Sequence, residues 1–310
     1  MIVNSRGHQS MRLDRLLTLY FFGSVIGMSR QSSCLKIPIL MYHSIARDVD
    51  DNVHPYFRTV TTPEIFEMHM QFLSQSGYEV LTLSEAVHLL QDESDQGIQQ
   101  PLTSSELRKT PDSLRRPVVV TFDDGFRDFY TTAFPILDRF GFKATVFLTS
   151  GLIGKTFLNG RECLNEQEIL ELVARGIEFG SHTVNHPQLK RLSSEEIVHE
   201  LAGSKASIED IVGLKVSLFS YPYSFPEEDV EFTRKLGDLL IEQGYSAGVT
   251  TVIGLSRSGD TSLFLRRLPM NDCDDRQFLR AKLEGGYDWL QKGQLAYKRL
   301  RAMYMNATAS

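Results

Sequence analysis

The sequence predicts an α/β fold in which a parallel β-sheet closes into a barrel surrounded by helices. Segments typical of strands and of helices alternate from residue 36 onward, with about eight strands in all. Capping residues and glycines mark the helix ends, and ionisable residues follow several strands. For 310 residues a closed barrel explains the alternation better than an open doubly wound sheet, and it would place function at the carboxyl ends of the strands.

The predicted strands are short apolar runs, rich in β-branched and aromatic residues and bounded by turn formers. We expect them at residues 36–42, 78–83, 118–122, 144–149, 177–181, 216–221, 246–251 and 263–268. The polar segment 92–116 contains Gly97, Pro101 and Pro111, so it is expected to form a surface loop.

The predicted helices have recognisable starts and stops. Thr62, Pro63 and Glu64 supply an N-cap, a first-position proline and a first-turn acid, and Gly77 ends the same helix. Helices are expected at residues 63–77, 84–91, 130–140, 165–175, 193–213 and 226–244.

The overall charge argues against a nucleic-acid-binding protein. The formal net charge is -6 and the sequence pI is ≈ 5.8, whereas such proteins normally carry a basic stripe. The basic segment "YKRLRAMY" is short and typical of a solvated helix face. The three cysteines, Cys34, Cys163 and Cys273, contain no C-x-x-C pair, which predicts neither a disulfide framework nor a thiolate zinc site.

The N-terminus resembles a signal peptide. Arg6, Arg12 and Arg15 precede the apolar run "LLTLYFFGSVIGM", which is too short for a stable transmembrane span. Export to the cell envelope or beyond is therefore favoured, with a cytoplasmic protein starting at Met28 as the alternative. The expected layout is a signal-like or disordered segment, one catalytic barrel domain and a helical tail, at residues 1–36, 37–290 and 291–310.

Polar residues follow several of the predicted strands, and together they form the candidate site. Those that follow strands are His43, Asp123, Asp124, His182, His186 and the segment Tyr221, Pro222 and Tyr223, while Arg266 and Arg267 lie in the last strand. Taken singly, each has a simpler interpretation: the aspartates as helix caps, the paired histidines as turn residues, and the first histidine as a core residue. Those interpretations do not explain why all of them fall at strand ends, where a barrel would bring them together.

Metal chemistry accounts for the combination. Two histidines at H-x-x-x-H spacing can face one ion, and a carboxylate from another strand completes a two-His, one-carboxylate set with positions open for water. The cation would lower the pKa of a bound water and keep a second, neighbouring aspartate ionised as a general base. One residue of the Asp123–Asp124 pair would thus bind the ion and the other would accept the proton.

Three segments carry a resemblance to a known family. "TFDDG", "SHTVNHP" and "FSYPYS" are similar to the first three motifs of the polysaccharide deacetylases, carbohydrate esterase family 4, which contain the NodB homology domain. The resemblance covers roughly residues 37–268. It implies a distorted (β/α)7 barrel, one divalent metal ion, and removal of N-acetyl groups from N-acetylglucosamine-type sugars of a glycan with release of acetate.

The same resemblance implies individual roles. Asp123 corresponds to the general base, and the metal ligands would be Asp124, His182 and His186. The backbone N–H of Tyr223 would help to hold the tetrahedral oxyanion. The adjacent Tyr221 and Pro222 would form walls of the acetyl pocket.

The chain departs from the family pattern in two places. Ser220 and Tyr221 stand where many members have an arginine, and no histidine follows His199 to supply the usual late general acid. However, "PILMYHSI" resembles the early histidine segment of exopolysaccharide-type members, which implies that His43 is the acid. "LRRLP" resembles the late Arg-x-Pro segment of that subgroup, which implies that Arg267 orients Asp123.

The predicted function is therefore metal-dependent N-deacetylation of an acetylated amino-sugar glycan. The nitrogen and oxygen ligands suit Zn²⁺ best among abundant ions, with Co²⁺, Ni²⁺ and Fe²⁺ as alternatives. Two other functions stay open, a catalytically inactive glycan-binding barrel and a hydrolase of a C–N bond in a small amide.

Outside the candidate site, Asp128 and His69 are expected on the surface or on a helix face. The acidic run "NDCDD" lacks the glycine and distal glutamate of a calcium loop.

Overall fold

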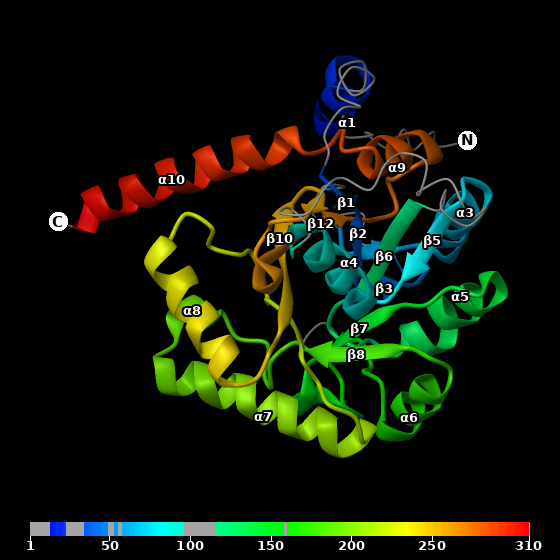
Figure 1. Cartoon of the computed structure of the whole chain (residues 1–310), viewed down its shortest axis with the longest axis horizontal. Coiled ribbons are helices and arrows are strands. Elements are labelled where there is room, and N and C mark those ends of the chain that lie inside the picture. Colours follow the sequence, from blue (N-terminus) through cyan, green and yellow to red (C-terminus); the bar gives the residue numbers. More distant parts are fainter. Residues whose placement is uncertain are drawn as a thin grey trace, which may run out of the picture.

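The computed structural model describes residues 13–22, 34–48, 53–54, 58–95, 116–157 and 160–309. Its main sheet has eight strands, and an additional pairing of β2 with β6 closes seven of them into a parallel barrel (Figure 1). Around the barrel the order is β2 (Ile39–Tyr42), β6 (Arg116–Phe122), β7 (Thr145–Leu148), β8 (Glu178–Ser181), β9 (Leu218–Ser220), β10 (Ala247–Ile253) and β12 (Leu265–Pro269). The predicted α/β barrel with seven strands is confirmed.

The remaining predicted strand lies outside the barrel. β5 (Tyr78–Leu81) pairs with the first half of β6, through residues 116–119, and β7 pairs with the end of β6. Short pairs formed by β1 (Lys36–Ile37) with β11 (Ser256–Arg257), and by β3 (Ser44–Ile45) with β4 (Val60–Thr61), lie beside the main sheet.

Helices surround the barrel and follow the predicted segments closely. They are α3 (Pro63–Gln75), α4 (Leu83–Asp95), α5 (Phe134–Phe140), α6 (Glu166–Ala174), α7 (Ser194–Val212) and α8 (Val230–Glu242), then α9 (Arg276–Leu283) and α10 (Trp289–Ala309). The segment before α5 is a π-helix, η4 (Phe129–Ala133), rather than the start of the α-helix. α9 was not among the predicted helices, whereas α10 contains the predicted helical tail and runs away from the barrel (Figure 1).

Local sequence explains most helix boundaries. Asn165 and Ser193 form capping boxes at the starts of α6 and α7, and Gly141 ends α5 in the left-handed conformation at φ 64°. Thr62 precedes α3 as predicted, but its hydroxyl does not cap the helix. Its backbone N–H and hydroxyl donate instead to Asp272, which joins the start of α3 to the segment after β12.

Alternation along the strands separates the barrel interior from its outer face. Ile39, Val119, Phe147, Leu218, Val249 and Leu265 belong to one buried cluster, which also contains residues of α4. Their sequence neighbours on β2, β6 and β7 belong to a second cluster with the surrounding helices, and Phe219 of β9 belongs to a third cluster with α7 and α8. Since successive side chains point to opposite faces, the inward rows continue through Thr121 to Asp123 and from Leu265 to Arg267. Polar groups thus fill the barrel interior near the carboxyl ends of the strands.

His69 was expected on a helix face, but it is fully buried on α3. Its Nε2 donates to the carbonyl oxygen of Asp274 at 2.6 Å, so its Nδ1 accepts from the Tyr42 hydroxyl at 2.9 Å. The Asp274 carboxylate in turn pairs with the buried ammonium of Lys282 at 2.8 Å. The acidic run therefore anchors α9 to the barrel.

Residues 13–22 of the predicted N-terminal segment are helical, whereas its last residue, Lys36, begins β1. α1 (Leu13–Leu17) and η1 (Thr18–Phe22) contact the C-terminal region, where Tyr287 donates to Asp14 at 2.6 Å and Trp289 donates to Thr18 at 3.1 Å. Residues 1–12 and 23–33 lie outside the described residues, as do residues 96–115 of the loop predicted at 92–116. The described ends of that segment are not loop, because α4 continues to Asp95 and β6 begins at Arg116. Over the described ranges, the helices lack the length and apolar character needed to cross a bilayer.

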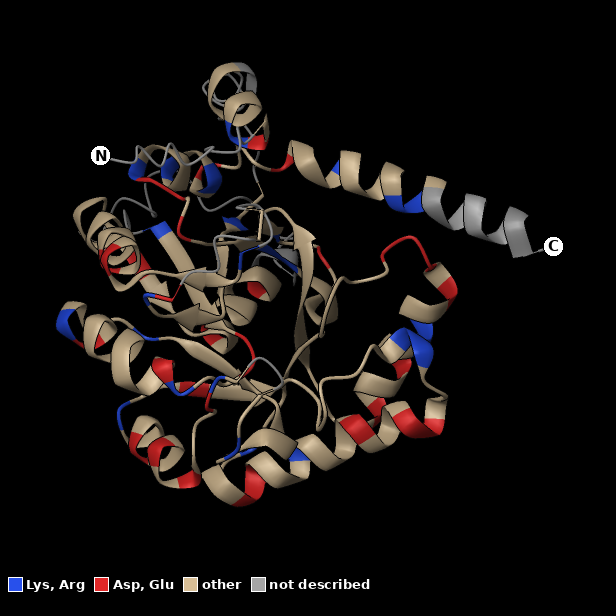
Figure 2. Ribbon diagram, turned by 180° about the vertical axis from the view of Figure 1, so that it is seen from behind, with Lys and Arg blue, Asp and Glu red and all other residues tan. Residues whose placement is uncertain are grey.

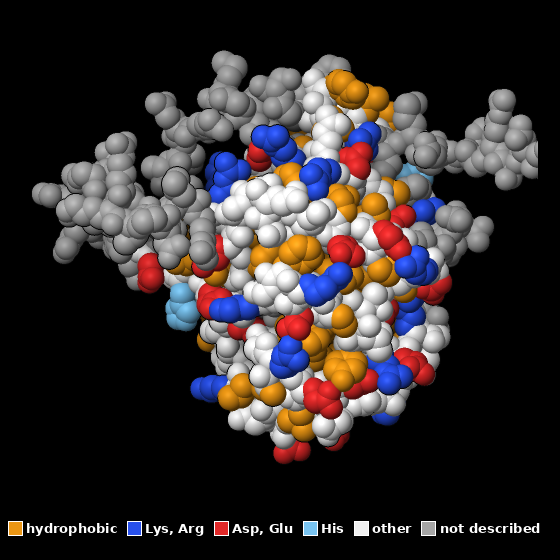
Figure 3. Space-filling model, turned by 90° about the vertical axis from the view of Figure 1, so that its right-hand side faces the viewer, with side chains coloured by type: hydrophobic (Ala, Val, Ile, Leu, Met, Phe, Trp, Pro, Cys, Tyr) orange, Lys and Arg blue, Asp and Glu red, His pale blue; other side chains and the backbone are white. Residues whose placement is uncertain are grey.

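Charges of both signs are mixed over the surface. Lys and Arg alternate with Asp and Glu on the helices in Figure 2, and the face drawn in Figure 3 carries both signs with small apolar areas between them.

Candidate active site

The site begins where β6 ends. Asp124 and Gly125 both have positive φ, 71° and 70°, so the chain turns sharply directly after Asp123. A Cβ atom at Gly125 would lie 2.8 Å from the Leu148 side chain, which explains why a glycine occupies this position. The turn leaves Asp123 in the inward row of β6 and directs Asp124 toward the loop that follows β8.

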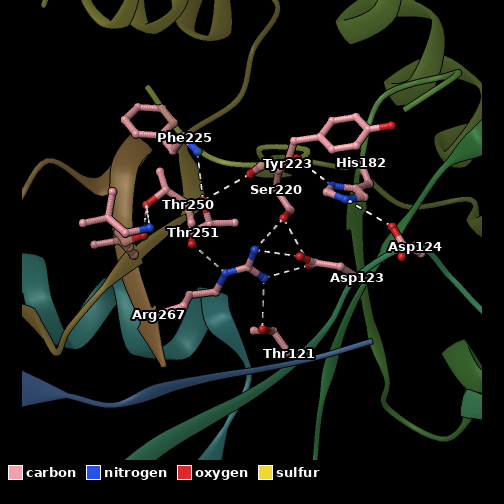
Figure 4. Close-up of polar contacts among 12 residues, drawn as sticks. Thr121, Asp123, Asp124, His182, Ser220, Tyr223, Phe225, Thr250, Thr251 and Arg267 are labelled. Atoms are coloured by element: carbon pink, nitrogen blue, oxygen red, sulfur yellow. Dashed lines mark hydrogen bonds and ion pairs between the residues drawn. The ribbon is translucent and has the colours of Figure 1, made fainter. Parts of the chain in front are cut away.

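Asp123 is buried and forms a two-point ion pair with Arg267. Both guanidinium nitrogens, Nη1 and Nη2, lie 2.7 Å from separate carboxylate oxygens (Figure 4). The arginine is fully buried, and it also donates to Thr250 O at 2.9 Å and to Ser220 Oγ at 3.1 Å. Ser220 Oγ donates to Asp123 at 3.1 Å. The predicted contact between Arg267 and Asp123 is therefore present in the structure.

Arg267→Met should lower the free energy of unfolding of the metal-free protein by about 3–5 kcal/mol, because the Asp123 carboxylate would stay buried without its counter-charge. Urea unfolding monitored by circular dichroism measures this loss. Ser220→Ala is the matched control, since it removes only hydroxyl hydrogen bonds and should cost about 1–2 kcal/mol. Equal small losses in the two variants would contradict this account of the pair.

The two histidines of "SHTVNHP" come from the loop after β8. His182 is buried, and its Nδ1 donates to Ser220 O at 2.8 Å, which leaves Nε2 facing Asp124. The backbone N–H of His186 donates to the Thr183 hydroxyl at 3.0 Å. Glu200 of α7 accepts from the backbone N–H groups of residues 184 and 185 at 2.8 and 2.9 Å. The loop conformation is thus fixed from several sides.

Asp124, His182 and His186 converge on one point. Asp124 Oδ1 lies 3.5 Å from His182 Nε2 and 3.4 Å from His186 Nε2, and one ligand atom from each residue lies within 4.8 Å of the others. Asp124 Oδ1 is buried and has no hydrogen-bond partner among the described residues. A buried carboxylate oxygen without a donor, facing two imidazole nitrogens, is the arrangement that a divalent cation would satisfy.

The electrostatics favour the same interpretation. Burial alone would raise the pKa of Asp123 and of Asp124. Arg267, His182 and His43 outweigh it at Asp123, the three histidines outweigh it at Asp124, and both pKa values are lowered. Burial would lower the pKa of His182, yet the two carboxylates outweigh it and the shift is upward. For His186, burial and the charge of His182 lower the pKa to about 4. Two anionic carboxylates beside a neutral imidazole suit a cation.

His43 lies at the same rim, directly after β2. Tyr42 pairs with Phe122, and the backbone N–H of Asp123 donates to Tyr42 O at 3.0 Å, so the next residues of the two strands are neighbours. His43 is partly exposed, and its imidazole contributes to the lowered pKa values of Asp123 and Asp124. The structure therefore brings the predicted acid into the group.

Of the predicted residues in "FSYPYS", only Tyr223 exposes its side chain at the site. Tyr223 is 47% exposed, and its ring lies 4.5 Å from that of His186. Pro222 is buried. The ring of Tyr221, expected as a pocket wall, is also buried and packs edge-on against Phe225 at 5.0 Å. Tyr221 is therefore a core residue, because its side chain points toward α8 where β9 ends.

Backbone strain is concentrated at this site. Among the described residues, the non-glycine residues with positive φ are Asp124, Thr183, His186 and Tyr223, at φ values between 55° and 71°. Such conformations are unfavourable for residues with a Cβ atom and persist only where surrounding structure enforces them. Here they occur in each of the three segments "TFDDG", "SHTVNHP" and "FSYPYS", so backbone strain identifies this region without reference to its charges.

Sequence analysis did not assign a role in this region to three residues that the structure places there. Ser220 joins Asp123 to Arg267, Glu200 holds the histidine loop, and Asp128, expected on the surface, is largely buried and binds the segment after His43. Ser220 was noted only as a departure from the family pattern. Its small side chain leaves the space that Arg267 fills from β12.

The fold and the groups at its rim are those of a barrel enzyme with a candidate divalent-cation site. A sequence model described as polysaccharide deacetylase matches residues 110–240. YxkH of Bacillus subtilis (strain 168), which carries the name of a polysaccharide deacetylase, is 31% identical over 235 residues, covering 75% of this chain and 71% of YxkH. The chain belongs to the polysaccharide deacetylase family.

Other relatives agree with this assignment. The poly-beta-1,6-N-acetyl-D-glucosamine N-deacetylase of Staphylococcus aureus (strain N315) is 26% identical over 124 residues, 37% of this chain and 43% of that protein. The deacetylase PplD of Streptococcus pyogenes, solved with acetate, has a TM-score of 0.63 at 25% identity, covering 81% of this chain and 99% of PplD. IcaB from Ammonifex degensii has the same fold, with a TM-score of 0.61 at 23% identity over 80% and 97%.

Proposed function

We propose that this protein is a metal-dependent N-deacetylase of N-acetylglucosamine-type units in a polysaccharide. The observation that carries the proposal is the buried Asp123–Arg267 pair directly beside the convergent Asp124, His182 and His186. The S. aureus relative, named for poly-beta-1,6-N-acetyl-D-glucosamine, supports a β-linked N-acetylglucosamine polymer as the substrate class. A glycan-binding barrel without turnover is not favoured, because binding alone does not need an ionised base held against a cation site.

The donor set fits a divalent cation with nitrogen and oxygen ligands, and Zn²⁺ is the ion we propose. When bound by Asp124, His182 and His186, it would polarise the acetyl carbonyl and make water more acidic. The orphaned Asp124 Oδ1 and the low pKa of His186 support this fit, since both leave lone pairs available.

The residues of the chain would then divide the reaction. Asp123 takes a proton from the attacking water, and Arg267 keeps the carboxylate ionised and in a fixed orientation. The backbone N–H of Tyr223 stabilises the negative charge that develops on the acetyl oxygen. His43 gives a proton to the sugar nitrogen as the C–N bond breaks, so acetate and a free amine leave.

Acetate release by the Zn²⁺-loaded protein tests the proposal. The panel consists of poly-β-1,6-N-acetylglucosamine, chitin oligomers, peptidoglycan and the small amide N-acetylethanolamine. We expect release from at least one glycan and none from the small amide, because remote sugar contacts supply binding energy used at the reacting centre. A metal-loaded protein that releases acetate from none of the glycans would contradict the proposed function.

Export stays a prediction from the arginine-flanked apolar run at residues 16–28. Sequencing the N-terminus of the protein recovered from the culture medium, the envelope and the cytoplasm tests it. A protein found only in the cytoplasm and starting at Met28 would contradict export.

A further inference from the structure

Asp128 connects the segment that carries His43 to the segment that carries the aspartate pair. The backbone N–H of Ile45 donates to Asp128 Oδ1 at 3.1 Å, and the Ser44 hydroxyl donates to Asp128 Oδ2. Ser44 and Ile45 directly follow His43, and Asp128 lies four positions after Asp124. One carboxylate therefore holds two loops of the rim together.

The carboxylate is built into this position. Asp128 occupies the N-cap position of η4, yet its side chain makes no capping hydrogen bond there and reaches across to β3 instead. Its side chain is 17% exposed. Arg161 lies 3.5 Å away and also pairs with Asp48 at 2.9 Å. Asp128 thus binds residues 44 and 45 instead of capping η4, the role that an aspartate at this position usually has.

The position of the His43 imidazole depends on its backbone. Within the part of the chain that the structure describes, no hydrogen bond reaches the ring of His43. The preceding residue is fixed by the β2–β6 ladder, and the following residues are fixed by β4 on one side and by Asp128 on the other. Without Asp128, residues 44 and 45 would lose both hydrogen bonds that join them to the start of η4.

We propose that Asp128 is a positioning residue that holds His43 at the distance from Asp123 and Asp124 needed for proton donation to the leaving nitrogen. This inference rests on the proposed function, in which His43 is the general acid. Asp128 acts through Ser44 and Ile45 and touches no reacting atom. Misplacing a catalytic group by about 1 Å can cost about 100-fold in rate, so a two-point clamp of this kind has a measurable effect.

The choice of substrate separates positioning of the acid from general damage. The nitrogen of an N-acetyl sugar must gain a proton as the C–N bond breaks, whereas the nitrophenolate of 4-nitrophenyl acetate leaves as an anion. A variant that misplaces only the acid should lose amide turnover and keep ester turnover. Damage to the cation site or to Asp123 should lower both.

The experiment compares Asp128→Ala, His43→Ala and the double variant, each loaded with Zn²⁺, on the glycan and on the ester. For Asp128→Ala we expect kcat on the glycan to fall about 10- to 100-fold with KM nearly unchanged, and ester turnover to stay within about twofold. In the His43→Ala background, Asp128→Ala should cause no further loss on the glycan. Asp128→Asn should restore part of the activity, because its Oδ1 can still accept from Ile45 and its amide can donate to Ser44.

Matched variants keep the test decisive. Asp48→Ala removes the exposed partner of Arg161 without touching residues 44 and 45, and it should leave both activities unchanged. If Asp128→Ala does not fold, Ser44→Ala removes one of the two bonds and should show the same selective loss of amide turnover.

Equal losses on both substrates, or additive losses in the double variant, would overturn the positioning role alone. Full glycan turnover by His43→Ala would overturn the assignment of His43 as the acid, and the positioning role with it. Wild-type protein that hydrolyses the ester but no glycan would overturn the proposed function, and the positioning role with it.

Discussion

Asp123→Asn should lower acetate release by the metal-loaded protein about 1000-fold, the loss typical when a positioned general base is removed. Asparagine is nearly isosteric and its Oδ1 can still accept from Arg267, but the buried guanidinium loses its counter-charge. Circular dichroism of the same preparation therefore has to show the wild-type fold before the rates are compared. What the asparagine lacks is the ability to take a proton from water. Because the other carboxylate, Asp124, faces the two histidines, metal content should be unchanged.

Steady-state acetate release and metal analysis of the same preparation measure the two quantities together. Asp124→Asn is the matched control at the neighbouring position, and it should lose metal as well as activity. An Asp123→Asn protein with wild-type turnover would show that another group is the base. Loss of metal from Asp123→Asn would instead place Asp123 among the ligands and reverse the assignment of the pair.

The alternation of strands and helices and the strand-end aspartates could be predicted because both follow from local chemistry. Apolar runs, caps and stops define each element, and inward alternation along β6 places Asp123 in the barrel. The position of Arg267 could be predicted only through resemblance, since 144 residues separate it from Asp123 and no local pattern links them. The sequence model of the family, which matches residues 110–240, includes neither His43 nor Arg267.

The misassigned residues share one physical cause, which is contact between distant parts of the chain. Asp128 stands at the start of a helical segment, where an aspartate usually caps, but its partners lie 83 and 84 positions earlier. His69 is a polar residue on a helix, and its buried partners are Tyr42 of β2 and Asp274, which precedes α9. Tyr221 follows a strand that ends earlier than predicted, so its ring turns into the core. Composition and spacing carry no information about such contacts.

The departures from the family pattern become consistent once these contacts are known. Ser220 stands where many members have an arginine, and in this chain a serine leaves room for the guanidinium of Arg267, which enters from β12. The serine hydroxyl contacts both members of the pair. The positive charge that the family pattern places on β9 is thus supplied by Arg267 of β12, and the Asp123 carboxylate still faces a guanidinium.

His182→Ala should abolish both metal binding and turnover. His182 is one of two imidazoles facing Asp124, and its ring is fixed by the hydrogen bond from Nδ1 to Ser220 O. Loss of a hydrogen bond behind a ligand already costs about 10- to 100-fold in metal affinity, so loss of the ligand itself should cost more than about 100-fold. Acetate release should fall to background.

Thermal unfolding with and without Zn²⁺ provides a readout that does not depend on activity. At a free metal concentration of about 100 times Kd, the wild-type protein should gain about 2.7 kcal/mol from binding, and His182→Ala should gain almost nothing. His43→Ala is the matched control, because it removes an imidazole from the same rim without removing a proposed ligand and should keep the full metal-dependent gain. If His182→Ala keeps that gain while His43→Ala loses it, the histidine after β2 rather than the one after β8 belongs to the cation site, and the roles of acid and ligand must be exchanged.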